Sequence, residues 1–215
     1  MDKAAVYQKL QEIGVVAVVR GKTTEDGVRT ADACIAGGVK AIELAFTTPD
    51  APAAIKELRA KYKDASDVVI GAGTVLDPAT ARLAIIAGAQ FIVSPAFDRE
   101  VVEMCNLYRV VSAPGVMTPG GVVEALKAGA DIIKVFPGDI VGVKMIKDIH
   151  GPLPQAPLMP SGGVSVENVP EWLAAGCVAV SAGSSLTGAA KKGDYAGVTA
   201  MAEKFVEAVR SARSK

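Results

Sequence analysis

Short runs of apolar residues alternate along the chain with longer stretches in which apolar and polar residues are mixed. The runs are rich in Val, Ile and Ala, as expected for strands that are buried on both faces of a parallel sheet. The mixed stretches have the spacing of amphipathic helices. The predicted strands are residues 15–20, 40–46, 67–72, 91–94, 110–113, 130–136, 158–160 and 178–182.

Helices are predicted between these strands, and several begin at side chains that cap helix N-termini, such as Thr23 and Asp77. Four Ala-Gly pairs close helices, and each glycine is expected to adopt the left-handed conformation that turns the chain back into the sheet. These pairs are Ala36-Gly37, Ala87-Gly88, Ala128-Gly129 and Ala175-Gly176. The predicted helices span residues 3–13, 23–37, 48–62, 77–88, 118–129, 141–149, 166–175 and 194–211, and another starts at residue 98.

Eight strands that alternate with helices, at about 27 residues per unit, predict an α/β fold of the closed (β/α)8 type, a TIM barrel. The helix at residues 3–13 is expected to cap one end of this barrel. The alternative is an open doubly wound sheet, but no G-x-G-x-x-G motif follows the first strand. Because no linker interrupts the pattern, residues 1–215 are predicted to form one domain.

Composition and charge narrow the possible functions. The 23 basic and 23 acidic residues cancel, which argues against a nucleic-acid partner. No apolar run approaches the roughly 20 residues of a membrane span, and no signal peptide is evident. The three cysteines lack a C-x-x-C spacing, which is typical of reduced thiols in a cytoplasmic protein. With a single histidine, neither a His-rich metal site nor a Ser-His-Asp triad is expected.

One predicted strand carries a lysine, Lys134, among apolar neighbours and just before Phe136-Pro137-Gly138. Burying an ammonium group is costly unless its charge is paired, so burial favours the neutral amine, a nucleophile toward carbonyl carbon. A buried salt bridge, or a side chain that extends to the barrel mouth, would explain Lys134 equally well.

The active site of a (β/α)8 barrel lies at the C-terminal ends of its strands. Glu43 and Lys134 are ionisable groups inside apolar strands and would face each other there if both point inward. They could form a structural ion pair, or act as a proton-transferring carboxylate and a nucleophilic amine. The side chains expected at these strand ends are Arg20, Glu43, Thr47, Thr74, Pro95, Lys134, Ser161 and Ser184.

Two glycine-containing turns follow the last two predicted strands: Ser161-Gly162-Gly163 and Gly183-Ser184-Ser185. In (β/α)8 barrels the loops after strands 7 and 8 often bind phosphate through backbone N–H groups. Each turn alone is a weak signal, but both stand where phosphate loops are expected. Together with Lys134 they predict a phosphorylated substrate that is attacked at a carbonyl group.

Six sequence blocks, in order along nearly the whole chain, resemble the 2-keto-3-deoxy-6-phosphogluconate / 4-hydroxy-2-oxoglutarate aldolase family. They are Ile42-Glu43-Leu44, Gly71-Ala72-Gly73-Thr74-Val75, Ile92-Val93-Ser94-Pro95, Pro114-Gly115-Val116-Met117-Thr118-Pro119, Lys134-Val135-Phe136-Pro137-Gly138 and Pro160-Ser161-Gly162-Gly163-Val164. The resemblance implies a class I pyruvate-dependent aldolase on a (β/α)8 barrel. Such an enzyme is expected to be a homotrimer, to need no metal or cofactor, and to act on a small keto-acid phosphate.

The resemblance also implies roles for individual residues. Lys134 falls on the Schiff-base lysine and Glu43 on the general acid/base, while Thr74 falls beside the pyruvate moiety. The phosphate-binding loops fall on Gly162, Gly163 and Ser184. Glyceraldehyde 3-phosphate and pyruvate are the expected products of the phosphogluconate substrate.

Two positions depart from the family pattern. Some members have an arginine that pairs with the substrate carboxylate where this chain has Thr47, and many have a threonine at the position of Ser161. Arg20 ends the neighbouring strand and is expected to reach the space that such an arginine would fill, where its planar guanidinium can hold a carboxylate through two bonds. The alternative is that Arg20 points outward or pairs with a carboxylate on a helix.

The sequence leaves other functions open. Within the aldolase class, the galactonate epimer and unphosphorylated hydroxy-oxoglutarate are alternative substrates. A phosphate-binding barrel isomerase or epimerase is another enzyme interpretation, although such chemistry has no use for an amine on a strand. A trimeric scaffold with a vestigial site is the non-catalytic alternative.

Overall fold

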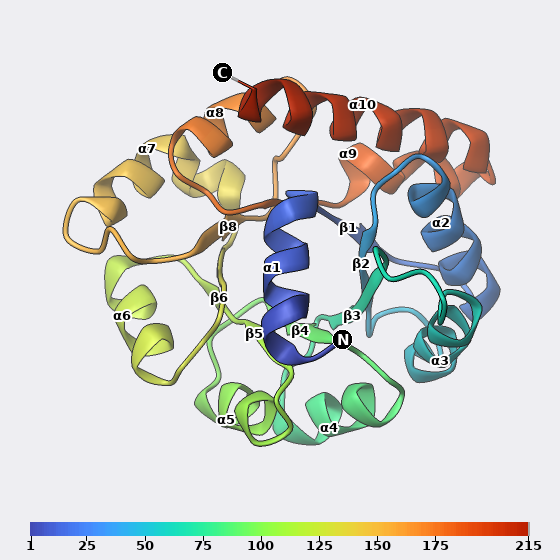
Figure 1. Ribbon diagram of the computed structural model, residues 1–215, viewed down its shortest axis with the longest axis horizontal. Coiled ribbons are helices and arrows are strands. Elements are labelled where there is room, and N and C mark those ends of the chain that lie inside the picture. The colour runs from blue at the N-terminus through green and yellow to red at the C-terminus, as the bar shows by residue number, and fades with distance from the viewer. Residues whose placement is uncertain (215) are drawn as a thin grey trace.

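The computed structural model describes residues 1–214, and its elements follow the predicted alternation of strands and helices (Figure 1). In this range the strands are β1 (Val15–Val19), β2 (Ala41–Ala45), β3 (Val69–Gly73), β4 (Phe91–Val93), β5 (Val111–Ala113), β6 (Gly115–Val116), β7 (Ile133–Val135), β8 (Leu158–Pro160) and β9 (Val180–Ala182). The helices are α1 (Lys3–Ile13), α2 (Thr24–Ala36), α3 (Ala51–Lys61), α4 (Pro78–Ile86), α5 (Arg99–Leu107), α6 (Pro119–Lys127), α7 (Gly138–His150), α8 (Val169–Ala174), α9 (Ser184–Thr187) and α10 (Tyr195–Arg213), with the 3-10 helix η1 (Gly188–Lys192) after α9.

The strands pair in parallel, which confirms the predicted α/β class. In the described range they form two sheets, ordered β5-β4-β3-β2-β1-β9 and β6-β7-β8, where a single eight-stranded sheet was expected. The predicted fifth strand, residues 110–113, corresponds to β5. The short strand β6 was not predicted and is separated from β5 by Pro114, which has no N–H to donate to a ladder. An isolated parallel bridge between Ser161 and Ser181 joins the end of β8 to β9.

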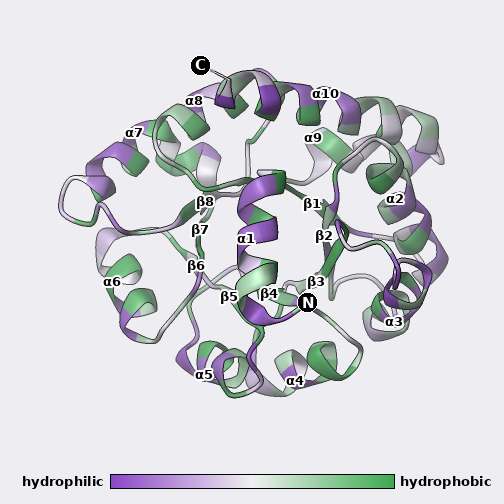
Figure 2. Cartoon of the chain, viewed as in Figure 1, coloured by the Kyte–Doolittle hydropathy of each residue, from purple (hydrophilic) through white to green (hydrophobic). Residues whose placement is uncertain are grey.

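The helices surround the strands, and α1 crosses the middle of the ring (Figure 1). The main apolar cluster packs the outer faces of the strands against the helices. A second, inner cluster contains one residue or more from most strands, together with Val6 and Leu10 of α1. Figure 2 shows the corresponding pattern, with hydrophobic colour on most strands and both colours along the outer helices.

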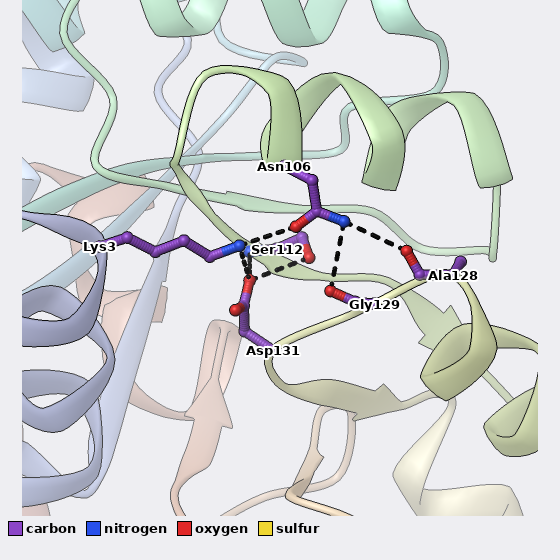
Figure 3. Close-up of polar contacts among 6 residues, drawn as sticks. All are labelled: Lys3, Asn106, Ser112, Ala128, Gly129 and Asp131. Carbon is purple, nitrogen blue, oxygen red and sulfur yellow. Dashed lines mark hydrogen bonds and ion pairs between the residues drawn. The ribbon is translucent and has the colours of Figure 1, made fainter.

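Helix α1 is held at both of its ends. The Lys3 amine lies 3.0 Å from Asp131 and donates to the Asn106 side chain at 2.8 Å, while Asp131 also accepts from the backbone N–H of Ser112 (Figure 3). At the other end, the Arg213 guanidinium donates to the carbonyl oxygens of the last turn of α1. The strand predicted at residues 130–136 is shorter in the structure, where β7 spans Ile133–Val135. Asp131 lies outside it and binds Lys3 and Ser112 instead.

Local details also differ from the sequence predictions. Gly88, Gly129 and Gly176 have positive φ angles as expected, but after α2 the left-handed residue is Gly38, with φ of 92°, and Gly37 has φ of −81°. Sequence reasoning did not predict α9 and η1, because their small residues read as a loop. Within residues 1–214, no helix combines the length and apolar character needed to cross a membrane.

Candidate active site

The alternation of side chains along the strands brings four polar residues into the space that the strands enclose. Side chains two positions apart on a strand share a face. Ala41, Ile132, Met159 and Ala179 belong to the inner apolar cluster. The residues two positions further on are Glu43, Lys134, Ser161 and Ser181, and all four are buried.

Lys134 and Glu43 are brought together, as predicted. Lys134 is 6% exposed, Glu43 is 1% exposed, and Lys134 Nζ lies 3.9 Å from Glu43 Oε1. Hydrogen bonds between an ammonium and a carboxylate usually measure about 2.7–2.9 Å, so this pair is loose. The amine and the carboxyl group are therefore close to each other but are not joined by a hydrogen bond.

The carboxyl group of Glu43 is held in a space that only glycine permits. A side chain at Gly73 on the neighbouring strand would collide with Glu43. Glu43 Oε2 is buried and has no hydrogen-bond partner among the described residues. Burial raises the pKa of Glu43 above its ordinary value, while the charges of Lys134 and Arg20 and the hydroxyl of Ser181 act in the opposite direction. A carboxyl group with a raised pKa is suited to exchange protons near neutral pH.

A cavity of about 220 Å³ opens above these groups. Lys134 lines it, whereas Glu43 is not part of the wall, although its Oε1 is 3.9 Å from the lysine amine. The other predicted residues in its wall are Arg20, Thr74, Pro95, Ser161, Gly162, Gly163, Gly183 and Ser184. Thr47 is not part of the wall, but it contacts Arg20. Val18, Phe136, Val164 and Ser185 also line the cavity, although the sequence predicted no role in the site for any of them.

Arg20 extends from the end of β1 across the ends of β2 and β3. Its Nη1 donates to Thr47 Oγ1 at 2.7 Å and to Thr74 Oγ1 at 3.3 Å. The guanidinium therefore occupies the region that sequence analysis assigned to a missing arginine at position 47. It also borders a second cavity of about 440 Å³, which Lys22 and Lys191 line as well.

The two glycine turns lie side by side in the cavity wall. Gly162 and Gly163 have φ angles of 89° and 68°, and a side chain at Gly163 would collide with Asp139. Ser185 Oγ donates to the Val164 carbonyl at 2.6 Å, which ties one turn to the other. Among the described residues, no carbonyl accepts from the backbone N–H groups of Gly162, Gly163 and Ser184. These N–H groups are free to bind an anion.

Sequence reasoning assigned no role to Ser181 or to Phe136. Ser181 is fully buried, and Lys134 Nζ lies 5.0 Å from the centre of the Phe136 ring. A hydroxyl inside the apolar run Val178-Ala179-Val180-Ser181-Ala182 was a possible signal. Its direction depends on the strand register, which the sequence alone does not give.

The arrangement suits one kind of chemistry. A buried amine faces a carbonyl-sized space, a proton-exchanging carboxyl group lies beside it, and an arginine and a set of free N–H groups border the same cavity. A carbonyl compound that carries an anionic group at each end fits this pattern of charges.

Most of the chain is similar in sequence to known aldolases. The family model described as "KDPG and KHG aldolase" matches residues 6–201. A 2-dehydro-3-deoxy-phosphogluconate aldolase of Treponema pallidum is 33% identical over 207 residues, which cover 95% of this chain and 97% of the relative. A 2-dehydro-3-deoxy-6-phosphogalactonate aldolase of Escherichia coli K12 is 32% identical over 202 residues, with coverage of 94% and 97%.

The fold of the chain is also similar to that of a solved aldolase structure. The KDPG aldolase of Legionella pneumophila, with pyruvate captured at low pH as a covalent carbinolamine intermediate, superposes with a TM-score of 0.83 at 30% identity. The match covers 94% of this chain and 97% of that one.

Proposed function

The chain belongs to the KDPG and KHG aldolase family, and from the geometry of its site we propose that Lys134 and Glu43 carry the lyase reaction of that family. The proposed substrate is 2-keto-3-deoxy-6-phosphogluconate, and the products are pyruvate and glyceraldehyde 3-phosphate. The observation that carries this proposal is a buried lysine amine 3.9 Å from a buried carboxyl group at the wall of a cavity.

In the proposed mechanism, the amine of Lys134 attacks the C2 ketone of the substrate to give a carbinolamine. Loss of water then gives a protonated imine, which withdraws electrons from the neighbouring bonds. Glu43, directly or through a water, removes the proton of the C4 hydroxyl, and the C3–C4 bond breaks with its electron pair moving into the enamine. Reprotonation of the enamine at C3 and hydrolysis of the imine release pyruvate and restore the lysine.

This mechanism needs no metal or organic cofactor, because the imine itself serves as the electron sink. Glu43 must lose its proton for the cleavage step and return one afterwards. Its raised pKa lowers the cost of holding that proton between the two steps.

Arg20 is the proposed partner of the substrate carboxylate. Its guanidinium already bridges Thr47 and Thr74 at the cavity edge, and arginine can hold a carboxylate through two parallel bonds. Thr74, Pro95 and Ser161 are proposed to surround the pyruvyl part of the substrate.

The phosphate is proposed to bind at the two glycine turns. The N–H groups of Gly162, Gly163 and Ser184 line the same cavity, and Gly183 precedes the serine. Positive φ angles at Gly162 and Gly163 let the backbone approach an anion without an intervening side chain.

The experiment that tests this function compares three substrates. The ratio kcat/KM for pyruvate release is measured with the phosphogluconate, its galactonate epimer and unphosphorylated 4-hydroxy-2-oxoglutarate. We expect the phosphogluconate to be cleaved most efficiently. A higher value for the epimer would assign the chain to the phosphogalactonate branch, and no pyruvate release from any of the three would contradict an aldolase.

The two sheets are also proposed to belong to one barrel. Since Pro114 interrupts one strand and the Ser161–Ser181 bridge joins β8 to β9, we propose that the two sheets act as one closed (β/α)8 barrel. Val6 and Leu10 pack into the inner cluster, which supports α1 as a cap on the N-terminal end of this barrel. Residues 1–215 would then form one domain.

A homotrimer is the proposed assembly. Large apolar side chains are exposed around α4 and α5, at positions where a monomer would leave them in water. They are Leu76, Leu83, Ile86, Leu107 and Tyr108. Light scattering after size exclusion is expected to give a trimer for the native chain and a monomer for Leu83→Glu/Ile86→Glu, whereas a native monomer would contradict the proposal.

Three buried thiols support a reducing, cytoplasmic environment. Burial raises the pKa of Cys34, Cys105 and Cys177 to about 12, and all three are free. Such thiols are inert at neutral pH, so we assign them to packing.

A further inference from the structure

Ser181 is a fully buried hydroxyl whose position points to more than packing. Its neighbours Val180 and Ala182 belong to the outer apolar cluster, and Ala179 belongs to the inner one. By alternation the side chain of Ser181 points into the space that also holds Glu43 and Lys134. An apolar residue there would avoid the cost of burying a hydroxyl.

The hydrogen bond between Ser161 and Ser181 leaves one hydroxyl proton without an acceptor in the pair. Ser161 Oγ donates to Ser181 Oγ at 3.4 Å, across the parallel bridge between the two residues. The Ser161 proton is used in this contact, and the Ser181 proton remains. A hydroxyl has one proton to give. Ser181 and Glu43 lie on the two strands that flank β1, beside Val16 and Val18, so the carboxylate of Glu43 is the charged acceptor on this inner face.

Glu43 needs such a donor. Its Oε2 has no hydrogen-bond partner among the described residues, and the Lys134 amine stands at 3.9 Å from its Oε1. This distance is too long for a hydrogen bond, so the lysine does not fix the plane of the carboxyl group. A carboxyl group that must move a proton works best when its orientation is held.

We propose that Ser181 is a positioning residue for Glu43: supported by Ser161, its hydroxyl donates to the Glu43 carboxylate and holds it toward the substrate. This rests on the proposed function, in which Glu43 exchanges the proton of the C4 hydroxyl. Ser181 supplies no nucleophile and is not part of the cavity wall. Its effect on the reaction passes through the carboxylate alone.

The proposal has two consequences for catalysis. Without the hydroxyl, Glu43 is less well oriented, so kcat falls while KM changes little. In addition, Ser181 opposes the effect of burial on the pKa of Glu43, so its removal raises that pKa further. If Glu43 acts as a base, kcat declines as pH falls through this pKa, and the acid limb of the kcat profile moves to higher pH.

The test compares Ser181→Ala and Ser181→Thr with the matched control Ser112→Ala. Ser112 is another buried strand serine, but its hydroxyl donates to Asp131, away from Glu43. Ser181→Ala should lower kcat about 10- to 100-fold, as expected for loss of a hydrogen bond to a charged group, and should shift the acid limb upward. Ser181→Thr should recover most of the rate, and Ser112→Ala should leave the limb in place. Should Ser181→Ala fail to fold, Ser181→Cys provides a similar volume with a weak donor.

A second comparison separates this inference from the proposed function. In a Glu43→Gln background, Ser181→Ala should cost less than about threefold, because no carboxylate remains to be positioned. If Glu43→Gln is slow and Ser181→Ala keeps the native kcat and acid limb, the inference is wrong and the proposed function stands. If Glu43→Gln is as active as the native enzyme, both are wrong.

Discussion

At the scale of a single residue, two features of the surroundings of Glu43 have opposite effects on its protonation. Burial favours its protonated form, and the charge of Lys134 favours the ionised form. Proton exchange by a positioned carboxyl group usually contributes about 10²- to 10⁴-fold to a rate. Glu43→Gln should therefore slow cleavage by this factor while imine formation with pyruvate continues. A loss of less than about tenfold in a folded variant would mean that Glu43 is structural.

The pH dependence of the native enzyme follows from the same carboxyl group. Because its pKa is raised, Glu43 becomes protonated at a higher pH than an ordinary glutamate, and the base is lost as pH falls through that value. The acid limb of kcat should thus lie above the ordinary carboxyl range. In Glu43→Gln the limb should disappear.

Arg20 provides a second prediction at this scale. If it holds the substrate carboxylate, Arg20→Met should weaken capture of pyruvate by about 1.5–3 kcal/mol, the range for a hydrogen bond to a charged group. The rate of imine formation at low pyruvate measures the effect. Lys22→Met is the matched control, since Lys22 borders the larger cavity but not the catalytic one. Equal rates in Arg20→Met and the native chain would assign the carboxylate to Thr47, Thr74 and backbone donors.

At the scale of elements, the glycine turns after β8 and β9 should distinguish phosphorylated from unphosphorylated substrates. Gly163→Ala adds a side chain at a positive φ where Asp139 already stands, so the turn must move. We expect kcat/KM to fall at least about tenfold more for the phosphorylated substrate than for hydroxy-oxoglutarate.

Gly142→Ala is the matched control for that experiment. Gly142 has a similar φ of 69°, but nothing lies within 4 Å of the added atom, and the residue is not in the cavity wall. The loss of kcat/KM in Gly142→Ala therefore measures the effect of backbone strain without a collision. Equal losses for both substrates in Gly163→Ala would show that the turn does not bind the phosphate.

The attachment of α1 is a further prediction about an element. Lys3→Met removes the ion pair with Asp131 and the bond to Asn106, both partly buried (Figure 3). We expect a loss of about 1–2 kcal/mol in the free energy of unfolding. For a chain of this size, that corresponds to a decrease in Tm of roughly 2–8 °C.

Lys9→Met is the control in the same helix, because its pair with Glu12 is more exposed. It should change the free energy of unfolding by less than about 0.5 kcal/mol. If both variants lose the same stability, the Lys3 cluster does not anchor α1. Turnover should be unchanged in both, since no residue of α1 lines the cavity.

The order and type of the main elements could be predicted from sequence because apolar runs, N-cap side chains and Ala-Gly pairs are local signals. The ends of the elements were harder to predict. Gly38 rather than Gly37 takes the left-handed conformation, and Asp131 leaves the predicted strand to bind Lys3. Both outcomes depend on tertiary contacts, which local patterns do not contain.

At the scale of the whole molecule, sequence indicated which strand ends would meet but not how their side chains would be paired. Glu43 and Lys134 were predicted to face each other, and the structure places them together. The contact of Arg20 with Thr74 and the inward direction of Ser181 come from the strand register. Register is set by the packing of all strands at once.

The measurement that tests the central claim most directly is reductive trapping of pyruvate. The native chain is treated with pyruvate and borohydride and then digested, and the peptide masses locate the adduct. We predict a reduced pyruvyl adduct on the peptide containing Lys134, none in folded Lys134→Ala, and native labelling in the control Lys144→Ala. An adduct on a different lysine, or undiminished labelling of Lys134→Ala, would contradict the account.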